Sequence, residues 1–300
     1  MKTARYTLGI CTSVAMLAGC GGSQPPIGVY GTTASAQAVS RDKVFKYTGG
    51  KQSFKVLPGV THVTITAYGA SGAPGGNFAS GDQALGGKGG EVTATIPVTP
   101  GERLAIFVGG KGEHGGFNGG GSVPGRYRYG FGGGASDVRQ GGDQIANRVV
   151  VAGGGGGAGG TGAASARGLG GAGGAGGGRR GGSGGAGEGT LTGGGGTGGK
   201  QHIGGNGGAG GASSCGGSDG TLGVGGAGGG SPSVCGTLGG GGGGGYFGGG
   251  GGGGGGFASS SNWGAGGGGG GGSAFAETSA THVKMFAGTN DGNGSILILW

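Results

Sequence analysis

The feature that most constrains this chain is a stretch from about Gly153 to Ser273 in which glycine outnumbers every other residue. Glycine accounts for 105 of the 300 residues, against a usual share of about 7%. Collagen is excluded, because it needs glycine at strictly every third position with abundant proline, and the chain has only 8 prolines. The stretch is therefore either a disordered tract or an ordered array of closely packed glycine backbones.

Within this stretch the non-glycine residues often recur at every third position, as in Ile203, Asn206, Ala209 and Ala212. A helix with three residues per turn places every third side chain on one edge and leaves glycine on the other two. Glycine then lets neighbouring backbones approach and exchange N–H···O=C bonds, which buried backbone requires. The spacing predicts a bundle of polyglycine-II helices over residues 153–274.

The first 19 residues have the pattern of an export signal. Lys2 and Arg5 supply a positive start, and residues 6–18 are mostly apolar. This apolar part is shorter than the roughly 20 residues of a membrane-spanning helix. The signal ends in Leu-Ala-Gly before Cys20, which resembles the lipobox of bacterial lipoproteins. The resemblance predicts cleavage before Cys20 and lipidation of that cysteine, and an ordinary signal peptide is the alternative.

Residues 20–42 are rich in Ser, Gln, Pro and Ala without apolar periodicity, which predicts a flexible tether. Removal of Lys2 and Arg5 with the signal would lower the formal net charge from +8 to +6 (8 − 2). The remaining charges are spread thinly along the chain. This distribution favours solubility over nucleic-acid binding.

Two cysteines, Cys215 and Cys235, remain beyond the signal and the lipidation position. In an exported chain, two cysteines 20 positions apart favour a disulfide between them. Closure of that loop would stabilise the fold by about 3 kcal/mol on a loop-entropy estimate. Two free thiols are the alternative, because spacing in sequence does not fix distance in space.

On both sides of the glycine stretch, polar and apolar residues alternate, which predicts β-strands. Val63, Ile65 and Ala67 would face a core while their neighbours face away. The Asp-Gly-Asn-Gly sequence at 291–294 predicts a hairpin between the last two strands. No helical periodicity is present outside the signal, so the folded part is predicted to be all-β. The expected strands cover residues 43–47, 52–56, 62–67, 91–96, 104–108, 137–139, 148–151, 281–286 and 295–300.

The last strand indicates where the glycine stretch lies in the fold. Residues 296–300 are apolar on both faces and need a partner strand on each side. A domain with strands both before residue 152 and after residue 280 must close around the glycine stretch. The sequence therefore predicts one β-sandwich built from residues 43–152 and 275–300, with residues 153–274 as an insertion rather than a tail.

Taken in order, these pieces resemble the glycine-rich domain of anaplastic lymphoma kinase and leukocyte tyrosine kinase, which many bacterial surface proteins share. The resemblance covers about residues 43–300 and implies a tumour-necrosis-factor-type β-sandwich that carries polyglycine-II helices. Kinase activity is not implied, because the chain has neither an Asp-Phe-Gly nor a His-Arg-Asp motif. The matching segments are 54–65, 97–104, 134–139, 148–156 and 292–296.

No motif predicts catalysis, a cofactor or a metal site. Residues 181–185 fit G-x-S-x-G around Ser183, but the match is expected by chance in this composition and lacks a strand-to-helix context. A calcium loop at 291–294 is disfavoured because its later ligands are missing. The histidines, which are scattered without metal-binding spacing, are His62, His114, His202 and His282.

Aromatic side chains that interrupt the glycine-rich segments are the candidate contact residues. A glycine bundle has no interior for them, so they pack at its rims, cap the sandwich or face a partner. Aromatic residues are favoured anchors at interfaces. The candidates are Tyr127, Tyr129, Phe131, Tyr246, Phe247 and Trp263.

Together these features predict a non-enzymatic lipoprotein of the cell envelope, on the outer membrane or cell surface, used in adhesion or envelope interaction. Its expected partners are the membrane, through Cys20, and an unidentified surface protein or polysaccharide, with no nucleic acid. The alternative is an ice-binding protein, because glycine bundles with disulfides resemble some arthropod antifreezes. Its support is thin, since it rests on Thr161, Thr190, Thr192 and Thr197.

Overall fold

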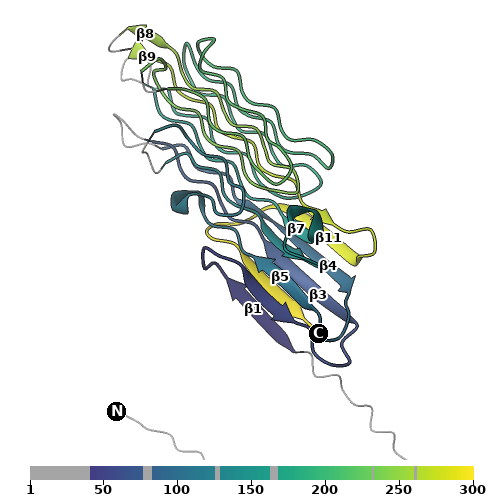
Figure 1. Cartoon of the computed structure of the whole chain (residues 1–300). Helices are drawn as coiled ribbons and strands as arrows, with labels where there is room; N and C mark the ends of the chain where they lie inside the picture. The colour runs from purple at the N-terminus through teal and green to yellow at the C-terminus, as the bar shows by residue number, and fades with distance from the viewer. Residues whose placement is uncertain (1–40, 77–82, 126–128, 163–167, 232, 260–261) are drawn as a thin grey trace, which may run out of the picture. The chain divides into compact units, whose positions relative to one another are not determined.

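The alternating segments form two antiparallel five-stranded sheets that pack face to face as a β-sandwich (Figure 1). The computed structural model describes residues 41–76, 83–125, 129–162, 168–231, 233–259 and 262–300, which belong to one compact unit. The prediction of an all-β fold is confirmed. The first sheet has the order β1 (Asp42–Lys46), β12 (Ser295–Leu299), β3 (His62–Tyr68), β4 (Gly89–Pro97) and β11 (Thr281–Asn290). The second has the order β10 (Phe275–Ala276), β7 (Arg148–Ala152), β6 (Ser136–Arg139), β5 (Arg103–Phe107) and β2 (Gln52–Lys55).

Four short elements lie outside these sheets. β8 (Phe257–Ser259) and β9 (Asn262–Trp263) form a separate two-stranded sheet within the glycine-rich region. The 3-10 helices η1 (Gly112–His114) and η2 (Ile145–Asn147) lie in the connections that follow β5 and β6.

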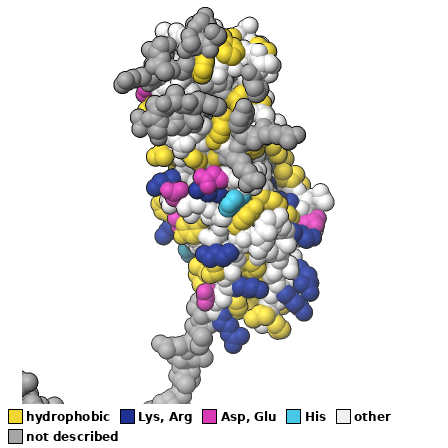
Figure 2. Space-filling view, turned by 90° about the vertical axis from the view of Figure 1, so that its left-hand side faces the viewer, with side chains coloured by type: hydrophobic (Ala, Val, Ile, Leu, Met, Phe, Trp, Pro, Cys, Tyr) yellow, Lys and Arg dark blue, Asp and Glu magenta, His cyan; other side chains and the backbone are white. Residues whose placement is uncertain are grey.

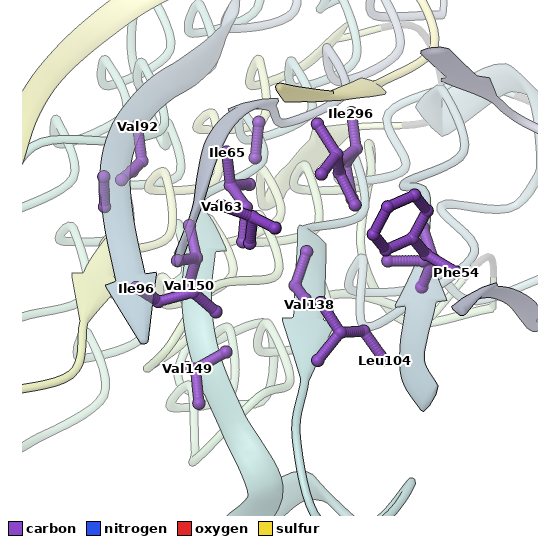
Figure 3. Close-up of a cluster of buried hydrophobic side chains, with 14 of the residues drawn as sticks. Phe54, Val63, Ile65, Val92, Ile96, Leu104, Val138, Val149, Val150 and Ile296 are labelled. Atoms are coloured by element: carbon purple, nitrogen blue, oxygen red, sulfur yellow. The ribbon is translucent and has the colours of Figure 1, made fainter. Parts of the chain in front are cut away.

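The core lies between the two sheets, and period-two alternation fills it. In β3, Val63, Ile65 and Ala67 are buried while the intervening residues face outward, as predicted. β5 follows the same rule, because Leu104 and Ile106 are buried. Figure 3 shows side chains from both sheets meeting in one apolar cluster. This cluster is what joins strands from the two ends of the sequence.

The last strand is central, as its apolar sequence requires. β12 pairs with β1 on one side and β3 on the other, so that Ile296 lies opposite both Phe45 and Ala67. Ile296 and Ile298 are fully buried. Because β7 precedes residues 153–274 and β10 follows them, and these two strands pair, the glycine stretch is inserted into the sandwich.

The predicted hairpin between the last two strands is wrong. β11 pairs with β4 and β12 with β1 and β3, so the connection passes over the ends of β3 and β4. The connecting loop is fixed by long-range bonds rather than by a tight turn. Asn293 Oδ1 accepts a bond from the Lys111 N–H at 2.8 Å, and the Gly292 N–H donates to Ser71 Oγ at 3.0 Å.

Backbone N–H groups in the glycine-rich region bond in rotation to three neighbouring segments. Those of residues 154–156 donate in turn to segments 238–244, 70–76 and 168–174, and those of 157–159 repeat the cycle. A three-residue cycle of bonds matches the three-residue spacing of the side chains. Figure 1 shows the segments lying side by side and extending away from the sandwich.

The segments divide into an inner group and an outer ring. The inner segments, which contain the longest glycine runs, are 153–161, 238–245, 248–256 and 264–273. At most glycines of the inner segments the neighbours leave no room for a Cβ, and one added at Gly251 would overlap the carbonyl oxygen of Ala227. Outer segments turn one edge to solvent and can carry side chains there. Each outer segment bonds to the next and the ring closes in the order 70–76, 84–90, 168–178, 180–188, 191–200, 203–211, 215–221, 224–230, 118–123 and 129–135.

The glycine-rich region in space is larger than the inserted stretch of residues 153–274. Segments 70–76 and 84–90 come from the connection between β3 and β4, and 118–123 and 129–135 come from the connection between β5 and β6. The chain therefore runs directly from β3 and β5 of the sandwich into segments of the glycine-rich region and back into β4 and β6. We call the whole array the glycine bundle.

Glycine in the inner segments is required by space, and alanine substitution tests this directly. We expect Gly251→Ala to lower the free energy of unfolding by about 3 kcal/mol, because the added methyl group overlaps backbone that cannot move aside. The matched control is Gly216→Ala in an outer segment, where the nearest atom to the new Cβ is 3.7 Å away. It should change the stability by less than about 1 kcal/mol. Urea denaturation of both variants provides the measurement, and equal losses would contradict the inner and outer assignment.

Candidate functional site

The candidate aromatic residues do not gather in one place. The ring of Tyr246 stacks on Phe275 of β10, with centroids 4.0 Å apart and planes 9° from parallel. Phe247 meets Tyr246 edge-on at 5.5 Å. These two residues lie where the glycine bundle joins the second sheet, so they cap the sandwich rather than offer a free surface.

Two further candidates lie against the outer ring. Phe131 is half-buried, and its carbonyl accepts a bond from the Ala73 N–H at 2.8 Å. The ring of Tyr129 covers Gly76, where any Cβ would overlap it. Tyr127 and the predicted lipidation residue Cys20 lie outside the described residues.

Trp263 is the candidate that reaches the end of the bundle away from the sandwich, where Figure 1 places β8 and β9. It pairs across the two-stranded sheet with Phe257, which is 46% exposed. The carbonyl of Leu191 accepts the N–H of Gly256, the residue before Phe257, at 2.8 Å. Leu191 and Val234 are also exposed at this end. We call Leu191, Val234, Phe257 and Trp263 the distal tip.

A disulfide braces the distal tip. Cys215 and Cys235 are bonded to each other, with Cα atoms 6.0 Å apart, and both are buried. The Cys215 carbonyl accepts the N–H of Gly254 at 2.7 Å, which joins the disulfide to an inner segment. Val234 is adjacent to this cross-link. The exposed Val234 therefore lies next to a cross-linked position of the backbone.

A buried ionic cluster joins the sandwich to the bundle. Asp137 of β6 is completely buried, and its carboxylate oxygens lie 2.7 Å from Arg139 Nε and 3.2 Å from Arg148 Nε. Asn118 donates a further bond to Asp137 Oδ2 at 2.7 Å. Arg148 Nη1 then donates to the carbonyl oxygen of Gly245 in an inner glycine segment at 2.9 Å. One carboxylate thus holds two cations from neighbouring strands.

Burial lowers the pKa of Arg148, and the negative charge of Asp137 opposes that effect. The Arg139 guanidinium also lies over the ring of Phe107, 3.8 Å from its centroid. The sequence pattern did not lead to a prediction of this cluster, although the sequence of β6 contains a pattern that indicates it. Asp137 and Arg139 are charged residues two apart in a strand, and both lie on the face that the bundle covers.

Titratable groups elsewhere are dispersed. His62 and His282 each lie 3.2 Å from the hydroxyl of the preceding threonine, and His114 stacks on Tyr47. Within the described residues, no group of three or more His, Cys, Asp and Glu side chains could hold a metal ion. Over the same part of the chain, no helix has the length and hydropathy of a membrane span.

A shallow hollow of about 280 Å³ lies on the outer side of β2 and β5. At its rim Lys51 and Asp143 form an exposed ion pair of 2.9 Å, and Arg103 lies on the β5 side. The hydrogen bond from Lys51 lowers the pKa of Asp143 below its ordinary 3.8. The ion pair therefore stabilises the folded state at pH values above the ordinary pKa of Asp143. This contribution is lost as the pH falls through the lowered pKa.

No protein-family model matches the chain, and no curated protein matches its sequence.

The buried cluster predicts an unequal response to removing two aspartate charges. Asp137→Asn should lower the free energy of unfolding by about 3–5 kcal/mol, because two buried arginines lose their counter-charge. Asp143→Asn removes the exposed partner of Lys51 and should have a much smaller effect. Chemical denaturation at neutral pH compares the two variants. Similar losses in both would mean that the Asp137 cluster does not hold the junction together.

Proposed function

We propose that this chain is a non-enzymatic lipoprotein of the bacterial cell envelope that presents its distal tip to a surface protein or polysaccharide. The observation that carries the proposal is the exposure of apolar side chains at the end of the bundle away from the sandwich. Apolar side chains that gather at one exposed end of a fold are typical of interaction sites. The disulfide beside the tip supports a binding role, because a fixed backbone loses little conformational entropy when a partner binds.

We infer that the glycine segments are polyglycine-II helices and that the sandwich is of the tumour-necrosis-factor type. The three-residue rotation of hydrogen bonds supports the first inference. The two antiparallel five-stranded sheets and the resemblance to the glycine-rich domain of anaplastic lymphoma kinase support the second. In this proposal the bundle is a spacer that holds the distal tip away from the sandwich.

Absence of catalysis is part of the proposal and rests mainly on the sequence. The G-x-S-x-G match places Ser183 in an outer glycine segment, whereas a nucleophile needs a base within hydrogen-bond reach. The ice-binding alternative has little support from its threonines. Thr161 is buried, and Thr197 Oγ1 accepts a hydrogen bond from the Asn206 N–H at 2.7 Å. Thermal hysteresis in solutions of the purified protein would favour ice binding over the proposal made here.

The anchor is tested at Cys20. We expect Cys20→Ser to abolish incorporation of labelled fatty acid and to move the protein from the membrane fraction to the soluble fraction, because several acyl chains are needed for stable anchoring. The matched control is Cys11→Ser, which changes a cysteine inside the predicted signal. Unchanged labelling and fractionation of Cys20→Ser would refute the anchor.

The distal tip is tested by removing one exposed aromatic ring. We expect Phe257→Ala to weaken retention of the purified protein on intact cells or envelope polysaccharide by about tenfold or more, as truncation of an interface anchor does. The control is Phe286→Ala on β11 of the sandwich, where the ring is 50% exposed, against 46% for Phe257. Equal retention of the two variants would remove the distal tip as the contact surface.

A further inference from the structure

The side of the sandwich formed by β1 and β2 is unusually basic. These are the edge strands of the two sheets, and they lie on the same side because the rings of Phe45 and Phe54 meet across the gap at 6.4 Å. A short connection with Gly49 at positive φ takes the chain from one sheet to the other. Five exposed basic residues lie on or next to these strands, at the start of β1, on β1 and β2, and on β5, which pairs with β2. We call them the basic edge: Arg41, Lys43, Lys46, Lys55 and Arg103.

Two members of the basic edge are placed against each other. Lys55 lies directly opposite Arg103 in the register of β2 and β5. Like charges in directly opposed positions destabilise a strand pair. Packing does not require this arrangement, because the core is served by the alternate residues Phe54 and Leu104. The exposed pair Lys55 and Arg103 lowers the stability of the fold, which indicates that these two cations serve a role other than folding.

Nearby acidic groups neutralise the basic edge only in part. Asp143 is paired with Lys51, and Glu102 Oε1 accepts bonds from the Thr99 N–H at 2.7 Å and from Gln140 at 3.0 Å. Among the described residues, no acidic side chain forms an ion pair with Lys55 or Arg103. Figure 2 looks onto this side and shows Lys and Arg side chains spread over the sandwich. Asp42, which is exposed on β1, and Glu102 each carry a negative charge here, so the five cations leave this surface a net charge of +3 (5 − 2).

The basic edge is also where the chain enters the sandwich. The N–H of Arg41 donates to the carbonyl of Trp300 at 3.1 Å, and the N–H of Trp300 donates back to Arg41 at 3.0 Å. The entry point is thus fixed on β1, at the start of the basic edge. Only residues 21–40 separate it from Cys20. A random-coil segment of this length spans roughly 25 Å, so with Cys20 in the membrane the edge is within reach of the lipid surface.

We propose that the basic edge docks on the anionic phospholipid headgroups of the membrane that carries the chain. The proposal rests on the lipid anchor proposed above. Lysine and arginine near an anionic membrane are attracted to it, and the attraction decays over a Debye length, about 8 Å at physiological ionic strength. Tethering supplies the proximity that this short-range attraction needs. Docking would hold the sandwich at the membrane and leave the distal tip free.

The test uses the chain from residue 20 onward with Cys20→Ser, so that no lipid is attached. Its partitioning is measured by sedimentation with vesicles of phosphatidylcholine, with and without phosphatidylglycerol. We expect binding only to the vesicles that contain phosphatidylglycerol, and loss of that binding at high salt. Lys55→Gln with Arg103→Gln should weaken the partition coefficient by about tenfold or more, because two cations are removed from the surface.

The matched control removes the same charge from the glycine bundle. Arg179→Gln with Arg180→Gln changes two exposed cations away from the basic edge and should leave partitioning nearly unchanged. A second edge variant, Lys43→Gln with Lys46→Gln on β1, should weaken binding as well. It keeps the test valid if the first pair proves to be needed for folding.

Three results would overturn the docking proposal: no binding to phosphatidylglycerol vesicles at low salt, equal loss in the control variant, or binding to an anionic polysaccharide but not to the vesicles. None of these depends on acylation, because the tested chain carries no lipid. Failure of the anchor would instead appear in the fatty-acid labelling of Cys20. The two proposals can therefore fail separately.

Discussion

The structure depends on backbone hydrogen bonds that rotate among neighbouring glycine segments. Each inner segment bonds to several neighbours, and glycine at most of its positions lets the backbones approach closely enough for these bonds. Such bonds contribute about 0.5–1.5 kcal/mol each, while ordering a residue costs about 1–2 kcal/mol. The array therefore needs constraints at its ends. The sandwich supplies them at one end and the disulfide between Cys215 and Cys235 at the other.

The sandwich can act as such a constraint because its strands come from both ends of the sequence. β12 lies between β1 and β3, so the last strand of the chain pairs directly with the first described strand. Asp137 and Arg148 then connect the second sheet to a glycine carbonyl at Gly245. An apolar core therefore holds the two sheets together, and a buried ionic contact holds the second sheet to the glycine bundle.

The aromatic side chains of the glycine bundle have different roles at its two ends. Tyr246 and Phe247 serve the junction with β10, whereas Phe257 and Trp263 lie at the distal tip. The sequence named Tyr246, Phe247 and Trp263 as candidates but could not separate their roles, because all three lie within the glycine-rich stretch. Leu191 joins the tip through a backbone bond from Gly256, and only the fold brings these residues together.

The sequence by itself determined the all-β class, the alternation that buries Val63, Ile65 and Ala67, the central place of the last strand and the insertion of the glycine stretch. These follow from local periodicity and from the need to bury apolar faces. Only the tertiary structure decided that the last two strands do not form a hairpin, that the connections after β3 and β5 join the bundle, and that the basic edge lies on one side. The physical reason is that these features depend on contacts between residues distant in sequence, which local pattern does not encode.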